Sequence, residues 1–373
     1  MAQETTNKES EAKLRSLAEN YQLAGRGASK PCFCCGISPS GPVIRTDSQP
    51  SLELLAAIKD CYVAWVDIPV TDMNSQAASL AAIIGFDPSV VSTLLKNEYA
   101  AYEDRNAELG LMLPAIKIGK FDVEALPLII LIRKNLVVSM HSTEVTRLEE
   151  VARYAATFMR KIKTDLPVED KVTIVLLRIV DQINARNFEK LRFLEEQGDE
   201  LNRLLMDPQT PRARLGPEIY QMKHGLIGYL NTMWATRSVL SALRYGDAEV
   251  ITDDDTLLGR VDMLAQHVEG QIGLAEHLSE VLASGLEVLQ SIYNNQLQIL
   301  NNRLALVMTF LTIIGTAVLV PNTLATILGN SAFGMVPRDL WWYIPMLIGS
   351  TVLATWLAWW WVKSKGWLPK KVD

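Results

Sequence analysis

The sequence predicts an α/β layered domain followed by long stalk helices and two transmembrane helices. Three observations predict this fold class. Strand-like and helix-like segments alternate up to about Thr143, apolar residues then recur at steps of three and four, and two long uncharged runs follow. We therefore divide the chain into a mobile tail at 1–55, a cytoplasmic α/β domain at 56–165, a cytoplasmic helical stalk at 166–303 and a membrane region at 304–373.

The first 55 residues mix charged residues with Gly, Pro and Ser and show no periodicity, which predicts a mobile tail. They include "KPCFCCGIS" with Cys32, Cys34 and Cys35, while Cys61 stands alone. This count and spacing fit neither a disulfide framework nor a pair of zinc-binding CxxC motifs. We expect reduced cytosolic thiols; the alternative is a soft-metal sensor formed by several subunits.

The α/β domain is predicted from segments with strand or helix character. "YVAWVDIPV" is strand-like, "SQAASLAAIIG" is helix-like up to Gly85, and "SVVSTLLKNEYA" predicts a second helix. Three further strands are predicted at "LGLMLPAIKI", "LPLIILIRK" and "NLVVSMHS", with a hairpin turn at Lys134 and Asn135. Strands and helices interleaved in this way indicate a layered α/β domain.

Helices are predicted for the stalk, because apolar residues recur with helical spacing in four successive segments after Thr143. The last of these begins near Thr256 and continues without proline to Val320. A single helix from there to near Gly329 would be longer than about 100 Å. Its apolar face would need other helices, from its own chain or from copies of it.

Two uncharged runs, 304–328 and 340–362, contain 25 and 23 residues, and each is long enough to cross about 30 Å of hydrocarbon. The alternative, two buried helices of a soluble core, is disfavoured because such helices carry charge on some face. The polar start "MAQETTNKES" lacks an apolar signal segment. We expect a multi-pass protein of the cell (inner) membrane with both termini cytoplasmic, because basic residues flank the runs: Arg303, Lys363, Lys365, Lys370 and Lys371.

Several function classes are disfavoured. The net charge of −6 and the lack of a basic stripe argue against nucleic-acid binding. The four histidines have no metal-ligand spacing, and no phosphate-binding glycine loop is present, so we expect neither an enzyme nor a bound cofactor. Transport driven by an electrochemical gradient is compatible with this pattern.

The first membrane run carries a polar stripe. Its residues keep helical steps of three, four and seven, so they share one side of the helix, whereas many of the positions between them are Ile, Val, Leu or Phe. Buried amides in a membrane face protein or water rather than lipid. The stripe is therefore either a hydrogen-bonded seam between helices or the wall of an aqueous path; it comprises Asn294, Asn301, Met308, Leu311, Gly315, Leu319, Asn322, Thr326 and Asn330.

The segment "QILNNRLALVMTFLTIIGTAVLVPNTLATILGN" resembles the pore helix of the CorA family of divalent-cation (magnesium/cobalt) channels. "VAWVDIP", "IILIRKNLVVSMHS" and "EIYQMKHGLIGYLNTMWATRSVLSAL" resemble the family in order and spacing, so the similarity runs from about residue 60 to the basic end. One departure is that the family's Gly-Met-Asn motif is altered here to adjacent Gly329 and Asn330. The resemblance implies a CorA-like funnel, a homopentamer whose first membrane helix lines a central pore.

The resemblance also implies roles for the stripe. Mg²⁺ loses its water reluctantly, so rings of neutral amide oxygens suit a hydrated ion. Met308 and Leu311 would form a hydrophobic gate that closes by dewetting. The implied substrate is Mg²⁺; the alternatives are a Zn²⁺, Co²⁺ or Ni²⁺ transporter of the same fold and a non-conducting membrane-anchored metal sensor. The implied pore and selectivity residues are Asn330, Gly329, Thr326, Asn322, Asn301 and Asn294.

Three consecutive acids, Asp253, Asp254 and Asp255, precede the long helix. They predict a helix cap with first-turn acids favoured by the helix dipole. The alternative, supported by the family's regulatory cations between cytoplasmic domains, is a metal sensor that neutralises repulsion between subunits. Other acids that could complete such a sensor are Asp67, Asp72, Glu103 and Asp104.

Overall fold

The computed structural model describes residues 31–47, 56, 58–145, 147–207, 210–211, 214–246, 248–329, 334 and 336–364. Predictions about the tail at 1–30 and at 48–55 lie outside these residues. The chain divides into two compact units, Met1–Leu286 and Glu287–Asp373. Residues that the sequence assigns to the α/β domain and to most of the stalk therefore share the first unit.

The first unit is built on a mixed sheet, in which the described strands follow the order β2-β1-β3-β7-β6-β5-β4. The pairing of β3 with β7 is parallel and the other pairings are antiparallel. The Lys134–Asn135 hairpin between β6 and β7 is confirmed by the pairing of Arg133 with Leu136. The strands are β1 (Cys32–Ser38), β2 (Gly41–Asp47), β3 (Val63–Val70), β4 (Ala101–Asp104), β5 (Leu109–Ile118), β6 (Val123–Arg133) and β7 (Leu136–Ser142).

The prediction of a mobile tail is wrong for residues 32–47, which form the β1–β2 hairpin beside β3. The Pro, Ser and Gly residues that suggested an irregular tail make the turn, where Gly41 has a φ of 121°. The cysteines act as small apolar side chains, since Cys32, Cys34 and Cys35 are all buried. The hairpin thus belongs to the core of the first unit.

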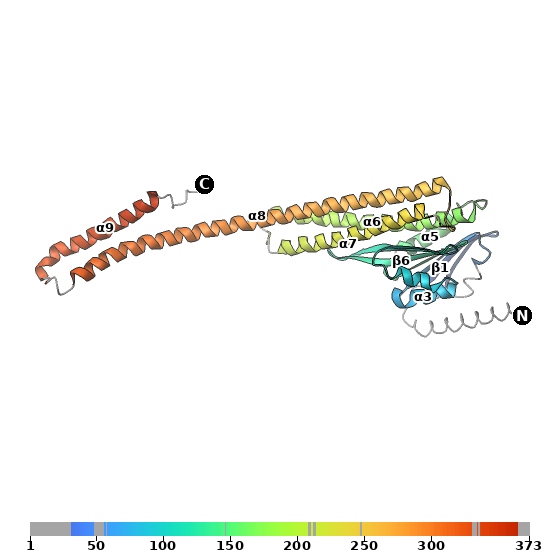
Figure 1. Cartoon of the computed structure of the whole chain (residues 1–373), viewed down its shortest axis with the longest axis horizontal. Coiled ribbons are helices and arrows are strands. Elements are labelled where there is room, and N and C mark those ends of the chain that lie inside the picture. Colours follow the sequence, from blue (N-terminus) through green and yellow to red (C-terminus); the bar gives the residue numbers. More distant parts are fainter. Residues whose placement is uncertain are drawn as a thin grey trace. The chain divides into compact units, whose positions relative to one another are not determined.

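Helices cover both faces of the sheet (Figure 1). Helices α3 (Met73–Ile84) and α4 (Pro88–Leu94) pack on the face that carries Val66, Ile68 and Met140. Helices α5 (Arg147–Met159), α6 (Val168–Met206) and α7 (Leu215–Tyr245) contact the sheet as well. Alternate residues of a strand point to opposite faces of the sheet. The residues next to Val66, Ile68 and Met140 in their strands therefore face α5, α6 and α7. The predicted α/β layering is confirmed.

A buried polar network joins the long helices to one another and to the sheet. The Asn187 side chain accepts a hydrogen bond from the Ile116 N–H and donates one to the Pro114 carbonyl, each at 3.0 Å. The Tyr229 hydroxyl donates to Gln271 Oε1 at 2.8 Å, and Gln271 Nε2 donates to Asn184 Oδ1 at 2.8 Å. Every buried member has a partner, so the network fixes how α6, α7 and the start of α8 align.

Helix α8 (Asp255–Leu328) is continuous over 74 residues, which confirms the single long helix predicted from Thr256 to near Gly329. Its part beyond residue 286 belongs to the second unit, together with the short 3₁₀ helix η3 (Pro337–Asp339) and helix α9 (Leu340–Ser364). Within the described residues α8 and the stretch Pro337–Ser364 are the helices long and apolar enough to cross a membrane. They match the two predicted membrane runs.

Candidate ion pathway on helix α8

The polar stripe lies on α8 and is exposed wherever the structure describes it. Asn294, Asn301, Asn322 and Thr326 are all exposed. The larger apolar members are exposed too, at 67% for Met308, 56% for Leu311 and 64% for Leu319. Exposed large side chains in a row along one helix indicate a surface that other molecules cover.

A different face of α8 packs toward α9. The α8 residues that line the space between the two helices are Met308, Thr309, Thr312, Ile313, Thr316, Val320 and Leu324. Apart from Met308, no member of the stripe is among them. The stripe and the α9-facing side are therefore separate faces of the same helix, and the stripe remains available for another partner or for water.

The polar atoms of the stripe are partly used and partly available. The Thr326 hydroxyl donates to the Asn322 carbonyl at 2.8 Å, which leaves the oxygen lone pairs of Thr326 as acceptors. The side-chain amide of Asn322 forms no hydrogen bond with another described residue. An amide can both accept from and donate to water, so this turn can hold the hydration shell of an ion.

The end of α8 reaches the altered motif. The Gly329 N–H donates to the Ala325 carbonyl at 2.9 Å and closes the last turn. A Cβ atom at Gly329 would lie 2.8 Å from that carbonyl oxygen, so the position favours glycine. Asn330, the predicted selectivity residue, lies outside the described residues, as does Ser331. The role of Asn330 in selectivity stays a prediction.

The two residues of the predicted hydrophobic gate differ in their surroundings. Met308 lines the space between α8 and α9 as well as belonging to the stripe, whereas Leu311 does not line that space. Both are more than half exposed. Met308 therefore lies at the border between the stripe and the α9-facing side, whereas Leu311 belongs to the stripe alone.

Of the three acids at the start of α8, Asp254 has a structural role. Its Oδ1 accepts a hydrogen bond from the Leu257 N–H at 2.9 Å, which is the helix cap predicted from the sequence. Asp253 and Asp255 are exposed. In the described part of the chain no three His, Cys, Asp or Glu residues are grouped so as to hold a metal ion. A metal sensor here would need ligands in addition to the described residues of this chain.

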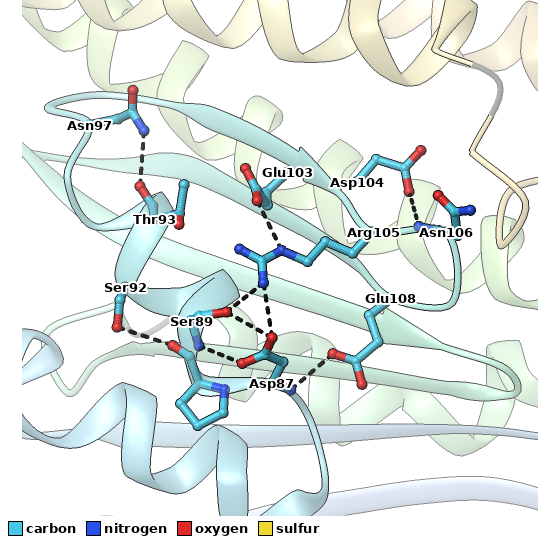
Figure 2. A network of polar contacts seen from close by, with 11 residues as sticks. Asp87, Ser89, Ser92, Thr93, Asn97, Glu103, Asp104, Arg105, Asn106 and Glu108 are labelled. Atoms are coloured by element: carbon cyan, nitrogen blue, oxygen red, sulfur yellow. Dashed lines mark hydrogen bonds and ion pairs between the residues drawn. The ribbon is translucent and has the colours of Figure 1, made fainter.

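The other acids considered for a sensor are engaged elsewhere. Glu103 and Asp87 flank the Arg105 guanidinium at 3.0 and 2.9 Å, and Figure 2 shows this group between the two carboxylates. Asp104 Oδ1 accepts from the Asn106 N–H at 3.0 Å. The Asp72 carboxylate caps α3, and hydrogen bonding to the Ser75 hydroxyl lowers its pKa. Asp67 is buried beside Ser139 and His141.

Sequence reasoning did not identify the threonines that face α9. The hydroxyls of Thr309, Thr312 and Thr316 donate to the carbonyls of Ala305, Met308 and Thr312, at 2.8, 2.8 and 2.9 Å. Each hydroxyl thus uses its hydrogen within the helix and keeps its oxygen lone pairs as acceptors. A spacing of four and three residues along the helix was the signal that could have revealed them.

Comparisons with known proteins agree with this architecture. The model of the family described as "CorA-like Mg2+ transporter protein" matches residues 61–364. The CorA magnesium transporter of Methanocaldococcus jannaschii is 18% identical, with a TM-score of 0.62 over 87% of this chain and 96% of that chain. The full-length CmaX protein is 16% identical, with a TM-score of 0.58 over 91% of this chain and 99% of that chain.

A third similar structure is the ZntB cytoplasmic domain from Vibrio parahaemolyticus RIMD 2210633. It is 12% identical, with a TM-score of 0.51 over 72% of this chain and 99% of that chain. No curated protein gives a significant match. These structural likenesses show the fold, while the family model spans most of the sequence. The chain belongs to the CorA-like Mg2+ transporter family.

Proposed function

We propose that this protein is a membrane channel for divalent cations, with Mg²⁺ as its substrate, and that it conducts hydrated ions along the axis of a homopentamer. The observation that carries the proposal is the face of α8 that bears Asn322 and Thr326. This face is exposed and is separate from the side that lines the space beside α9. Five copies turned inward would surround an axis with amide and hydroxyl groups.

Neutral oxygen ligands suit this task. A hydrated divalent ion can be held through hydrogen bonds to its water shell, and neutral acceptors hold it weakly enough to let it leave. Asn330 is assigned to the mouth, Asn322 and Thr326 to the rings next to it, and Asn301 and Asn294 to the far end of the path. Leu311 and Met308 form the constriction between them. Both termini lie in the cytoplasm, which makes Asn330 the outer end.

A Zn²⁺, Co²⁺ or Ni²⁺ transporter of the same fold is the second candidate, and the likeness to the ZntB cytoplasmic domain favours it. Metal uptake by proteoliposomes that contain the purified protein distinguishes the candidates. Selective Mg²⁺ uptake supports the proposal, and transition-metal uptake supports the second candidate. If the proteoliposomes take up no metal at any concentration or pH, the proposal of a channel is contradicted. A non-conducting, membrane-anchored metal sensor would then remain as the alternative.

The assignment of the mouth has its own test. Asn330→Ala removes one acceptor from each subunit, and Mg²⁺ uptake should fall sharply because the apolar rim cannot replace hydrogen bonds to the hydration shell. Asn330→Asp adds negative charge and should alter selectivity. Ser331→Ala is the matched control. If Asn330→Ala keeps wild-type Mg²⁺ uptake and Ser331→Ala loses it, Ser331 rather than Asn330 would be assigned to the ring at the mouth.

A further inference from the structure

A long cavity of about 870 Å³ lies between α8 and α9 inside the second unit. On α8 its lining extends from Met308 to Leu324, a length of about 24 Å at 1.5 Å per residue. On α9 it extends from Ser350 to Val362, a length of about 18 Å. One leaflet of the hydrocarbon core is about 15 Å thick. The cavity is thus long enough for an extended acyl chain of one leaflet.

The walls of this cavity are apolar, although they contain four hydroxyl residues. The hydroxyls of Thr309, Thr312 and Thr316 donate to backbone carbonyls of their own helix. The Ser350 hydroxyl does the same toward the Leu347 carbonyl at 2.8 Å. With their donors occupied, these four side chains keep only oxygen lone pairs as acceptors, and the rest of the lining is mostly apolar, including Leu353, Leu357 and Trp360.

The cavity is unsuited to ions or to a file of water molecules. Its lining holds no charged residue and no side-chain amide. Asn322, whose side-chain amide can hydrogen-bond to the water shell of an ion, lies on the other face of α8. An apolar cavity within a bilayer is filled by hydrocarbon, because burying an apolar chain there leaves no polar group unsatisfied.

Positive charge stands at one end of the cavity. Lys363 directly follows the lining residue Val362, is exposed, and places its Nζ 4.9 Å from the centre of the Trp359 ring. On α8, Arg303 comes five residues before Met308 and is also exposed. Tryptophan and lysine at a helix end are typical of the headgroup region of a membrane. Basic groups at that depth attract anionic lipid headgroups.

We propose that the groove between α8 and α9 binds one acyl chain of an anionic phospholipid, whose phosphate lies beside Lys363. The length of the cavity selects an acyl chain, and the charge at its end selects an anionic headgroup over a zwitterionic one. The bound lipid stabilises the position of α9 beside α8, on the side of α8 that does not carry the polar stripe. This site is independent of which metal the protein transports.

The test uses the full-length protein in liposomes that contain phosphatidylglycerol with a photoactivatable diazirine in its acyl chain. After illumination, peptide mass spectrometry locates the adducts. We expect them on cavity residues such as Thr316 and Leu353, in excess over Val352, which is 65% exposed on the opposite side of α9. Lys363→Gln leaves the cavity intact and should lower labelling about fivefold, the effect of one lysine near an anionic surface.

Two matched variants and a second probe complete the test. Ala354→Phe fills the cavity and should remove the adducts, whereas Val352→Phe adds the same ring outside it and should not. Phosphatidylcholine with the same diazirine chain should label the cavity about fivefold less than phosphatidylglycerol. Equal labelling of all faces, or no effect of Lys363→Gln, contradicts the proposal. A benzophenone at position 316 that crosslinks to a second copy of the chain would assign the groove to a neighbouring subunit instead.

Discussion

The four cysteine side chains lie in or next to the sheet of the first unit, and all of them are buried thiols. Burial raises the pKa of Cys35 to about 11, and the neighbouring Cys61 adds to this effect. Burial also raises the pKa of Cys61. A thiol that stays protonated is a poor nucleophile and a poor metal ligand. Within one folded chain Cys35 and Cys61 therefore behave as core side chains.

Cys35 should resist alkylation in the native protein. At pH 9 an unfolded thiol with the ordinary pKa of 9.0 is half ionised, whereas a thiol with a pKa of about 11 is about 1% ionised, so iodoacetamide should react roughly 50-fold more slowly. Because the folded pKa is raised, the stabilisation from this thiol is present below pH 9 and is lost as the pH rises toward 11. Mass spectrometry of labelled peptides, with and without urea, measures this difference; equal rates in both would contradict it.

The acids at the start of α8 allow a test of sensing that leaves the helix cap in place. Asparagine is as good a cap as aspartate, so changing Asp253, Asp254 and Asp255 to Asn removes charge while keeping the acceptor for the Leu257 N–H. If these acids sense metal, Mg²⁺ should protect the variant from limited proteolysis less than it protects the wild type. Unchanged protection would leave Asp254 with its capping role alone.

Among the secondary-structure elements, the contact of α6 with β5 depends on one side chain. Asn187 satisfies the Ile116 N–H and the Pro114 carbonyl, both buried in the sheet. Asn187→Leu would leave both backbone groups without partners and should cost about 3 kcal/mol. Thermal denaturation of the full chain in detergent should show a clearly lower midpoint than that of the control Asn74→Leu, which changes an exposed helix residue. Equal midpoints would show that the network is dispensable.

The sequence was most informative where periodicity was strong. The segment "LGLMLPAIKI" is β5 (Leu109–Ile118) residue for residue, and the long helix α8 begins within one residue of the expected start. Strand β4 (Ala101–Asp104) was not expected, since "AYED" is short and polar and forms the edge of the sheet. The β1–β2 hairpin was missed because Gly, Pro and Ser mark a tight turn as readily as an unstructured tail.

The candidate site was only partly predictable. The steps between Asn294, Asn301 and Asn322 placed them on one side of α8, and that requires helix geometry alone. The spacing of Thr309, Thr312 and Thr316 also places these residues on one side of α8, but residue type alone does not show which side faces α9, because both sides contain threonine. The threonine hydroxyls on both sides donate to a backbone carbonyl four residues earlier, so only the position of α9 in three dimensions distinguishes the two sides.

In the assembled protein, other helices are expected to cover the exposed apolar part of α8. Leu297, Leu300 and Leu304, at steps of three and four, are 58%, 52% and 54% exposed and continue toward the stripe. An apolar row of this kind is stabilised when other helices cover it. We predict a homopentamer of about five times 41.5 kDa in detergent, measured by mass photometry. A stable monomer or dimer would contradict the pore.

The stripe on α8 is proposed here as the ion path, and one pair of adjacent asparagines, Asn301 and Asn302, provides the sharpest test of this role. Asn301 and Asn302 are chemically identical and both exposed, but they lie about 100° apart around the helix, and Asn301 alone belongs to the stripe.

Each of these two residues is changed to Ala, and Asn322→Ala serves as the corresponding change deeper in the membrane. The measurement is Mg²⁺ uptake by proteoliposomes, normalised to the amount of assembled protein. We expect uptake to fall about tenfold or more in Asn322→Ala and to fall clearly in Asn301→Ala, because every subunit loses a hydrogen-bonding group for the hydrated ion. Asn302→Ala should keep wild-type uptake. Wild-type uptake in both Asn322→Ala and Asn301→Ala, or an equal loss in Asn302→Ala, would contradict the role of the stripe as the ion path.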